Sequence, residues 1–530
     1  MSIIVKHISY IHPDRETLFR DISFSISDNQ KINLIGDNGS GKSTLLQIVA
    51  ERLRASSGEI VLSEKPYYIP QHFGQYDHLT VAEALRINTK IEALHAIING
   101  DASIENFTRL DEDWNIEERA NKALSLWDLD HIALSQQIST LSGGEKTKVF
   151  LLGIAIHSPS IILLDEPSNH LDAKSRQQLY DFIKSYKGTI IVVSHDRTLL
   201  NLLNITYELN RDSIDIYGGN YEFYKAQKAE KLNALQAQLN EKEKELRQAL
   251  QVAQLASERK QREDSRGKKI QKQGGIPRIA INRLKDQAEG SASKLKETHS
   301  EKIGDIADDL NHIRQKLPDS KDLKISFENA NLHTGKILIT AKDINFGYSS
   351  DLLWNNALNF QIRSGDRVAI SGSNGIGKTT LLKLVLGKLE PTTGTLVRAD
   401  FKYLYVDQEY SIIDNRLTVF EQVEQFNSQN FEEHKLKRYL HHFLFSYDTW
   451  DKPCSKLSGG EKMKLVFCCL MVSSDTPDMF ILDEPTNNLD IQSLEIVTST
   501  IKEYKGTILV ISHDQYFIKE IGVDTSINLE

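Results

Sequence analysis

Short apolar runs, each followed by a polar or glycine-rich stretch, recur along the chain. Apolar runs without alternation predict strands that are buried on both faces of a parallel sheet, and the amphipathic patterns between them predict helices. The same order of runs appears twice, so the sequence predicts two copies of one α/β domain. The runs are 31–36, 161–165 and 190–194 in the first copy, and 367–372, 479–483 and 507–512 in the second copy, which begins near Leu323.

The segment between the copies has a different pattern. It is rich in Lys, Glu, Gln and Ala, and its apolar residues follow heptad-like spacing, which predicts two long helices in an antiparallel coiled-coil hairpin. Gly274 to Pro277 breaks the pattern and marks the expected tip. The predicted apolar positions are Leu232, Leu235, Leu239, Leu246 and Leu250 on one helix, and Ile303, Ile306, Leu310, Ile313 and Leu317 on the other.

The spacing of the repeated motifs shows where the copies differ. Gly36 and Gly372 are 336 positions apart, whereas Leu141 and Leu457 are only 316 apart, so the first copy contains about 20 additional residues. Shared flanking sequence narrows this insert to about residues 89–114, and helical spacing within it predicts a short helical arm. We therefore expect domains at 1–220, 221–320 and 321–530.

A phosphate-binding sequence follows the first buried run of each copy. Gly-x-x-x-x-Gly-Lys followed by Ser or Thr is typical of a P-loop, whose backbone N–H groups wrap phosphates at a helix N-terminus. Lys42 and Lys378 are expected to contact the β- and γ-phosphates. The expected nucleotide-binding residues are Gly36, Asn38, Gly39, Gly41, Lys42, Ser43 and Thr44, with Gly372, Asn374, Gly375, Gly377, Lys378, Thr379 and Thr380.

A later strand of each copy ends in carboxylates that could bind Mg²⁺ and assist the hydrolysis of a phosphate bond. Ser43 and Thr379 supply hydroxyl oxygens, and Asp165 and Asp483 supply carboxylate oxygens, which are the ligands that Mg²⁺ prefers. Glu166 and Glu484 directly follow these aspartates and are placed to polarise the attacking water. His195 and His513 end the next strand. These four residues are the expected catalytic residues. A lone histidine is more often structural, but the whole constellation occurs twice in the same order.

Composition and charge limit the class of protein. The chain has 530 residues and a formal net charge of −9, and its three cysteines have no metal-ligand spacing, so we expect reduced structural thiols in the cytoplasm. No signal peptide is indicated, and the longest apolar stretches are too short to cross a bilayer. Residues 221–320 contain 21 basic and 16 acidic residues, with 12 basic against 4 acidic from 259 to 296. Such a cluster suits phosphate neutralisation, although a solvated lysine-rich hairpin is an equally good reading of charge alone.

A further repeated motif, Leu-Ser-Gly-Gly-Glu at 141–145 and 457–461, makes the chain resemble ATP-binding-cassette (ABC) proteins. The resemblance implies two ABC-type nucleotide-binding domains and an ATPase that converts ATP and water to ADP and phosphate. In that family ATP lies between the P-loop of one domain and the signature motif of the other, so the chain is expected to form an intramolecular dimer of its two copies. The signature residues implied at the nucleotide are Ser142, Gly143, Gly144, Ser458, Gly459 and Gly460. The Q-loop residues Gln71 and Gln408 are implied at both the nucleotide and the metal. Tyr10 and Tyr348 either stack on adenine or are half-exposed strand tyrosines.

Two tandem domains joined by a helical linker resemble the ABC-F family of cytoplasmic ATPases, as does the junction sequence at 217–221. That resemblance implies binding at the ribosomal exit site, a linker that reaches toward the P-site tRNA and the peptidyl-transferase centre, and an arm near the stalk. It implies a role in regulating translation or in protecting the ribosome against antibiotics. Arg278, Arg283 and Lys285 are the expected RNA contacts.

Two alternatives come from other classes. The ATPase component of a transporter would need separate membrane subunits, and the basic hairpin would then have no evident role. A DNA-associated ABC ATPase is the other alternative, but the family's DNA-linked members carry an extra C-terminal coiled coil, which does not follow the second copy in this sequence.

Overall fold

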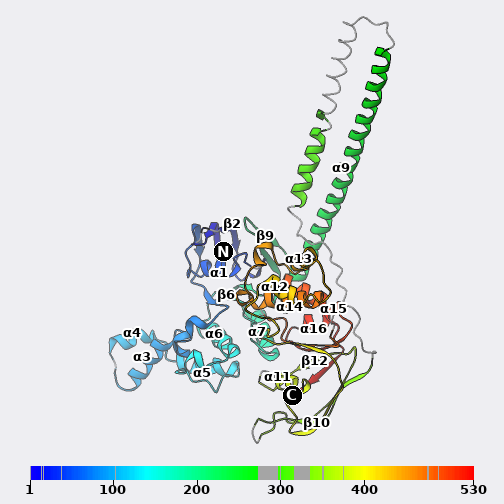
Figure 1. Ribbon diagram of the computed structural model, residues 1–530. Helices are drawn as coiled ribbons and strands as arrows, with labels where there is room; N and C mark the ends of the chain where they lie inside the picture. Colours follow the sequence, from blue (N-terminus) through cyan, green and yellow to red (C-terminus); the bar gives the residue numbers. More distant parts are fainter. Residues whose placement is uncertain are drawn as a thin grey trace. The chain divides into compact units, whose positions relative to one another are not determined.

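The computed structural model describes residues 2–529, except 14, 16, 38, 102, 273–296, 299, 315–334, 349–350, 374, 474–476 and 488. Its contacts divide the chain into two compact units, one formed by Met1–Glu222 with Leu323–Glu530 and the other by Phe223–Asp322. The first unit contains both copies of the α/β domain, and the second is helical (Figure 1). The expected start of the second copy near Leu323 lies outside the described residues.

The first copy combines a small antiparallel sheet with a larger, mainly parallel one. In the small sheet, β1 (Ile3–Ile11) pairs with both β2 (Thr17–Ile26) and β4 (Ser57–Leu62). The larger sheet has the order β5-β6-β7-β3-β8-β9, and only its β8–β9 pair is antiparallel. Its strands are β3 (Lys31–Ile35), β5 (Tyr67–Ile69), β6 (Ile161–Asp165), β7 (Thr189–Val193), β8 (Ile205–Leu209) and β9 (Ile214–Tyr217).

Helices cover the larger sheet, which explains its unbroken apolar strands. Every residue of β6 and β7 is buried, as expected for parallel strands with both faces covered. Asp172 and Asp196 end the loops after these strands, and their side chains accept backbone N–H bonds as helix N-caps. The helices are α1 (Lys42–Val49), α2 (Val81–Ala84), α6 (Gly143–His157), α7 (Ala173–Ser185) and α8 (Arg197–Asn201).

The second copy repeats this arrangement. β10 (Ile337–Asn345) pairs with β11 (Leu358–Arg363) and β13 (Thr393–Arg398) in a small antiparallel sheet, and a parallel sheet has the order β14-β15-β16-β12-β17. The strands of the parallel sheet are β12 (Arg367–Ser371), β14 (Tyr403–Val406), β15 (Met479–Asp483), β16 (Thr507–Ile511) and β17 (Thr525–Asn528). The helices are α11 (Lys378–Val385), α12 (Val419–Gln425), α13 (Glu433–His442), α14 (Gly459–Val472), α15 (Ile491–Glu503) and α16 (Gln515–Glu520).

The region of the expected arm is helical. α3 (Asn88–Ile98) packs against α4 (Ile104–Leu110), and α5 (Ile116–Leu126) follows. The chain leaves α3 at Asn99 and Gly100, where the sequence pattern breaks. Buried Leu94 and Leu110 join the apolar core of the first copy, so these helices are anchored by ordinary packing.

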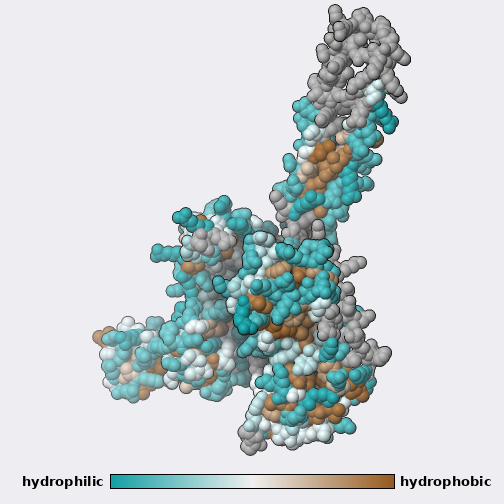
Figure 2. All heavy atoms as spheres, in the orientation of Figure 1, coloured by the Kyte–Doolittle hydropathy of each residue, from teal (hydrophilic) through white to brown (hydrophobic). Residues whose placement is uncertain are grey.

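The helical unit contains two helices with charged contacts between them. α9 (Tyr221–Lys272) is long, and residues 300–314 form a second helix; Lys242 lies 3.0 Å from Asp309, and Arg314 lies 2.8 Å from Glu243. The apolar seam differs from the prediction at one position, since Leu250 is 49% exposed while Ala249 is half-buried. The heptad therefore continues through the alanine, and the leucine faces outward. Figure 2 shows an apolar stretch flanked by hydrophilic side chains along the described part of this unit. The tip residues and Leu317 lie outside the described residues.

Cys454, Cys468 and Cys469 are buried free thiols in the core of the second copy. Burial raises the pKa of Cys454 to about 11 and also raises the pKa of Cys468 and Cys469, so all three thiols are protonated at neutral pH. None of the described helices has the length and apolarity that a bilayer crossing requires.

Candidate nucleotide-binding sites

Each P-loop connects an interior strand of the larger sheet, β3 or β12, to a helix. Lys42 is the first residue of α1, and its Nζ donates to the carbonyl oxygens of Gly36 and Asp37, each at 2.9 Å. Gly41 has a φ of 94°, and a Cβ there would collide with Leu18, so only glycine fits this turn. Gly377 has the matching φ of 100°. The two loops therefore have the same backbone course at the helix N-terminus, where phosphates bind.

The hydroxyl that follows each P-loop lysine contacts the expected aspartate. Ser43 Oγ donates to Asp165 Oδ1 at 3.0 Å, and Thr379 Oγ1 donates to Asp483 Oδ2 at 3.4 Å. Burial raises the pKa of both aspartates, because the opposing hydrogen bonds and the charge of the P-loop lysine do not outweigh the loss of solvent. A hydroxyl and a carboxylate at hydrogen-bonding distance give a donor set made only of oxygen, which fits Mg²⁺.

A buried glutamate follows each aspartate and adopts left-handed backbone geometry. Glu166 has a φ of 53° and Glu484 a φ of 52°, and such strain in a residue other than glycine is typical of functional sites. The Nε2 atoms of His195 and His513 lie 3.3 Å from Oε1 of Glu166 and Glu484. In the part of the chain that the structure describes, these Oε1 atoms are buried without a hydrogen-bond partner. Each carboxylate therefore has an oxygen free for a ligand or water.

The two glutamates differ in their electrostatic surroundings. Burial and, to a smaller extent, the negative charge of neighbouring Asp165 raise the pKa of Glu166 to about 8. Burial raises the pKa of Glu484 to about 7, and the strongest opposing influence is the positive charge of Arg176 from the first copy. Burial also lowers the pKa of His195, and lowers that of His513 to about 4, so both imidazoles are neutral at pH 7.

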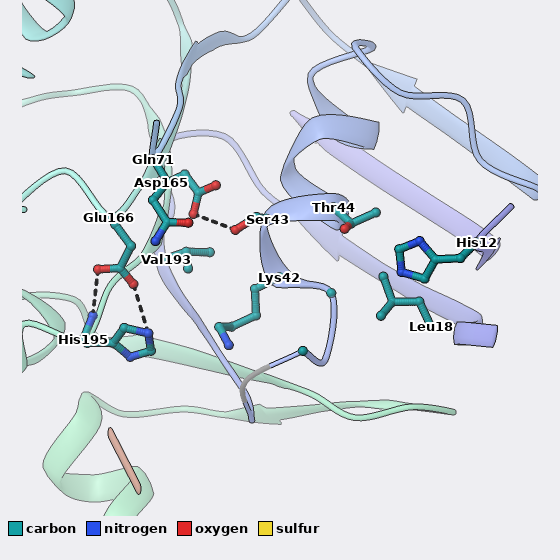
Figure 3. A pocket seen from close by; sticks show the side chains of 12 residues that line it. His12, Leu18, Lys42, Ser43, Thr44, Gln71, Asp165, Glu166, Val193 and His195 are labelled. Atoms are coloured by element: carbon teal, nitrogen blue, oxygen red, sulfur yellow. Dashed lines mark hydrogen bonds and ion pairs between the residues drawn. The ribbon is translucent and has the colours of Figure 1, made fainter. Parts of the chain in front are cut away.

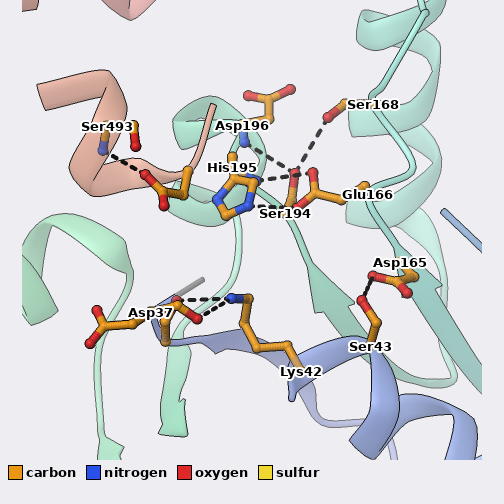
Figure 4. A network of polar contacts seen from close by, with 12 residues as sticks. Asp37, Lys42, Ser43, Asp165, Glu166, Ser168, Ser194, His195, Asp196 and Ser493 are labelled. Atoms are coloured by element: carbon orange, nitrogen blue, oxygen red, sulfur yellow. Dashed lines mark hydrogen bonds and ion pairs between the residues drawn. The ribbon is translucent and has the colours of Figure 1, made fainter. Parts of the chain in front are cut away.

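The first P-loop borders a cavity of about 330 Å³. Figure 3 shows Lys42 in its centre, with Asp165, Glu166 and His195 on one side and Thr44, His12 and Leu18 on the other. Figure 4 shows the polar network behind it, in which Ser43 joins Asp165 and the backbone N–H of His195 donates to Glu166. Gln71 also lines this cavity. The cavity thus holds lysine, hydroxyl, carboxylates and histidine together.

The second P-loop borders a larger cavity, of about 490 Å³, to which both copies contribute. Gly143 and Gly144 begin α6, and Ser142 forms a capping box with Glu145 at its N-terminus. This helix terminus faces the P-loop of the other copy, an arrangement that suits an anion shared between them. The lining residues from the first copy are Ser142, Gly143, Gly144, His170, Leu171 and Arg176; those from the second are Gly375, Gly377, Lys378, Thr379, Thr380, Gln408, Asp483, Glu484, Asn487, Ile511 and His513.

Some expected residues do not line these cavities. Ser458 is the N-cap of α14, but neither it nor the glycines that follow are among the described residues around the first cavity. Tyr10 packs against His12 and Phe19, and Tyr348 is 67% exposed and contacts Thr380, so adenine stacking by either tyrosine stays a prediction. The residues outside the described part of the chain are Asn38, Asn374, Arg278, Arg283 and Lys285.

Sequence reasoning missed several lining residues. His12 lies two residues beyond Tyr10 and places an imidazole in the first cavity. His170 and Arg176 reach the second cavity from the first copy. A comparison of the two copies aligned at Asp172 and Asp490 would have drawn attention to Arg176, because the second copy has Leu494 at that position.

Comparison with known proteins gives the class of this arrangement. Residues 19–169 and 355–487 match the ABC transporter family, and both matched segments contain a P-loop and its aspartate. ABC transporter F family member 2 of Arabidopsis thaliana is 30% identical over 95% of this chain and 73% of its own length. ATP-binding protein Uup of Escherichia coli is 28% identical over 98% of this chain and 79% of its own length.

Solved structures share the fold. RNase-L Inhibitor has a TM-score of 0.60 at 18% identity and covers 98% of this chain and 87% of its own. The archaeal ribosome recycling factor aABCE1, solved in complex with the ribosomal stalk protein aP1, has a TM-score of 0.58 at 19% identity, covering 97% of this chain and 86% of its own.

The two sites thus define a tandem ATP-binding-cassette ATPase, which binds and hydrolyses ATP. Within this class, the chain belongs to the ABC-F family.

Proposed function

We propose that this chain is a cytoplasmic ATPase that binds the ribosome at its exit site, directs the hairpin toward the P-site tRNA and the peptidyl-transferase centre, and uses ATP hydrolysis to leave. In this way it regulates translation or protects the ribosome against antibiotics. The observation that carries the proposal is that each copy has a P-loop cavity with its lysine, hydroxyl, carboxylates and histidine, while the sequence that links the two copies is helical and has excess positive charge. Two solved structures that share the fold support it, because one contains an archaeal ribosome recycling factor and the other is a model of ribosome-bound archaeal Pelota and ABCE1.

The proposed chemistry assigns a role to each buried group. Lys42 and Lys378 bind the phosphates, and Glu166 and Glu484 accept the proton of the attacking water through the oxygen that has no hydrogen-bond partner. His195 and His513, whose Nε2 atoms lie 3.3 Å from these oxygens, are placed to hydrogen-bond the γ-phosphate. Mg²⁺, held by Ser43 with Asp165 or by Thr379 with Asp483, and by Gln71 or Gln408, would neutralise charge on the phosphates.

A variant that binds ATP but cannot hydrolyse it tests the ribosome partner. The double variant Glu166→Gln and Glu484→Gln keeps the shape of both side chains and removes the basic oxygen, so we expect it to remain bound to ribosomes when ATP is present. The measurement is co-sedimentation through a sucrose cushion, with the same variant in ADP as the control. A double variant that sediments free of ribosomes with ATP present would overturn the proposal.

Charge removal in the hairpin tests RNA contact. Changing Arg278, Arg283 and Lys285 to Gln removes up to three phosphate contacts, which reduces the slope of log affinity against log salt by about 2 to 3. The control changes three exposed basic residues in the described part of α9, Lys231, Lys244 and Arg247, to Gln, with the same loss of charge. An equal effect of both triple variants, or none from the first, would assign the RNA interface elsewhere.

A further inference from the structure

Arg176 lies at the boundary between the two copies, in the second nucleotide site. It is in the first turn of α7, whose N-cap is Asp172, and its Nε donates to the carbonyl oxygen of Leu171 at 3.1 Å. This bond fixes the base of the guanidinium, which lines the cavity together with Lys378 and Glu484. Its charge also interacts with Glu484 and His513 of the second copy.

Most hydrogen-bond donors of the Arg176 guanidinium are unused. Arginine carries five N–H groups, and within the described ranges Arg176 uses only Nε in a hydrogen bond and forms no ion pair. The nearby carboxylate of Glu484 is directed toward His513. A planar cation with free donors, in a cavity already built for phosphates, fits an anionic oxygen of the bound nucleotide.

Among the described residues, the first nucleotide site has no such cation from the opposite copy. The residue equivalent to Arg176 is Leu494, which is 2% exposed and belongs to the apolar core of the second copy. Contact with the first P-loop is instead made by Gln492, whose Nε2 donates to Asp37 Oδ1 at 2.6 Å. A neutral amide therefore lies across from the first P-loop, whereas an arginine lies across from the second.

We propose that Arg176 is a catalytic residue of the second site only, where it binds the phosphates of ATP from the opposite copy and makes the two sites unequal in their hydrolysis rates. The reaction is the ordinary one: water adds to the γ-phosphorus, the bond to the β–γ bridging oxygen breaks, and Glu484 takes the proton. Charge shifts toward the phosphate oxygens during this step, so a positioned guanidinium stabilises the transition state more than the ground state. The inference rests on the proposed roles of Glu166 and Glu484.

Single-site backgrounds separate the two rates. Glu166→Gln leaves only the second site active, and Glu484→Gln leaves only the first. In the Glu166→Gln background, Arg176→Gln is expected to lower kcat for ATP by on the order of tenfold or more, as for other charged donors to a transferring phosphoryl group. Arg176→Lys retains the charge and is expected to recover part of that loss. In the Glu484→Gln background, the same Arg176 changes are expected to have no comparable effect.

A neighbouring lysine supplies the matched control. Lys174 is on the same helix, pairs with Asp128 at 2.7 Å and does not line the cavity, so Lys174→Gln removes the same charge and leaves kcat unchanged in both backgrounds. An Arg176→Gln loss that is equal in both backgrounds would mean a structural role and overturn the inference, as would an unchanged kcat in the Glu166→Gln background. Failure of the glutamate roles is distinguishable, because neither single-site background would then lose activity by itself.

Discussion

The contact between α8 and α16 gives a prediction about how the two copies hold together. Arg197, at the start of α8, is 3% exposed, and its Nη1 donates to Glu520 Oε2 of the second copy at 2.5 Å. Its Nε and Nη2 are buried without hydrogen-bond partners among the described residues. Burial disfavours the charged form of Arg197, and Glu520 is the main group that offsets this effect. Asp514 and Tyr221 contribute less.

The loss of unfolding free energy depends on which residue of the pair is replaced. Breaking a fully buried ion pair costs roughly 3–5 kcal/mol, because the remaining charge has no partner. Glu520 is 40% exposed and Asp514 remains, so Glu520→Gln should cost less, about 1–3 kcal/mol. Replacing both partners, as in Arg197→Met with Glu520→Gln, removes the unpaired charge as well. The double variant should therefore be more stable than the sum of the two single changes predicts.

Urea denaturation of the full chain provides the measurement, with fluorescence reporting the unfolding of the unit that holds both copies. Lys519→Gln, an exposed neighbour on the same helix, is the control and should change the unfolding free energy little. If the two single changes were simply additive, the argument that Glu520 compensates a buried guanidinium would be refuted.

Two further predictions concern the buried glutamates and the packing of α6. Because burial raises the pKa of Glu166 to about 8 and that of Glu484 to about 7, the folded nucleotide-free protein keeps protons that the unfolded chain, with a pKa near 4.5, releases. The contribution of these groups to the unfolding free energy should therefore fall as pH rises from about 4.5 toward 8, and the double Glu→Gln variant should lose this dependence. The measurement is urea denaturation from about pH 5 to 8.5. If the unfolding free energy of the variant and of the unchanged protein had the same slope against pH, the prediction would be wrong. At Gly153, an added Cβ would overlap the hydroxyl of Tyr67, so Gly153→Ala should lower stability by about 1–3 kcal/mol, and an unchanged melting temperature would show that Tyr67 can move away.

The sequence predicted the local chemistry well and the contacts between the copies poorly. The apolar runs at 161–165 and 479–483 correspond to β6 and β15, because strands covered on both faces admit few polar residues. The P-loop lysines, hydroxyls and aspartates meet because the ends of parallel strands lie at one edge of a sheet. The position of Arg176 in the second nucleotide site was not predicted, because its neighbours in the second copy are more than 190 positions away in the sequence.

Side-chain choices between close neighbours also escaped prediction. The coiled-coil pattern indicated Leu250, but the half-buried position is Ala249, three residues after Leu246. At the first nucleotide site, the ring that reaches the cavity belongs to His12, while Tyr10 packs against Phe19. Tyr10 lies in β1 and His12 follows the end of that strand, and the sequence alone does not fix the course of the chain beyond the strand.

The burial of the three native thiols has a practical consequence for following motion. Maleimide dyes react with exposed thiolates, and Cys454, Cys468 and Cys469 offer none at neutral pH. A pair of cysteines introduced on the surface, one in each copy, should therefore accept donor and acceptor fluorophores without removal of the natural residues. Any change in the distance between the two copies during turnover then becomes observable by energy transfer in an otherwise unaltered molecule.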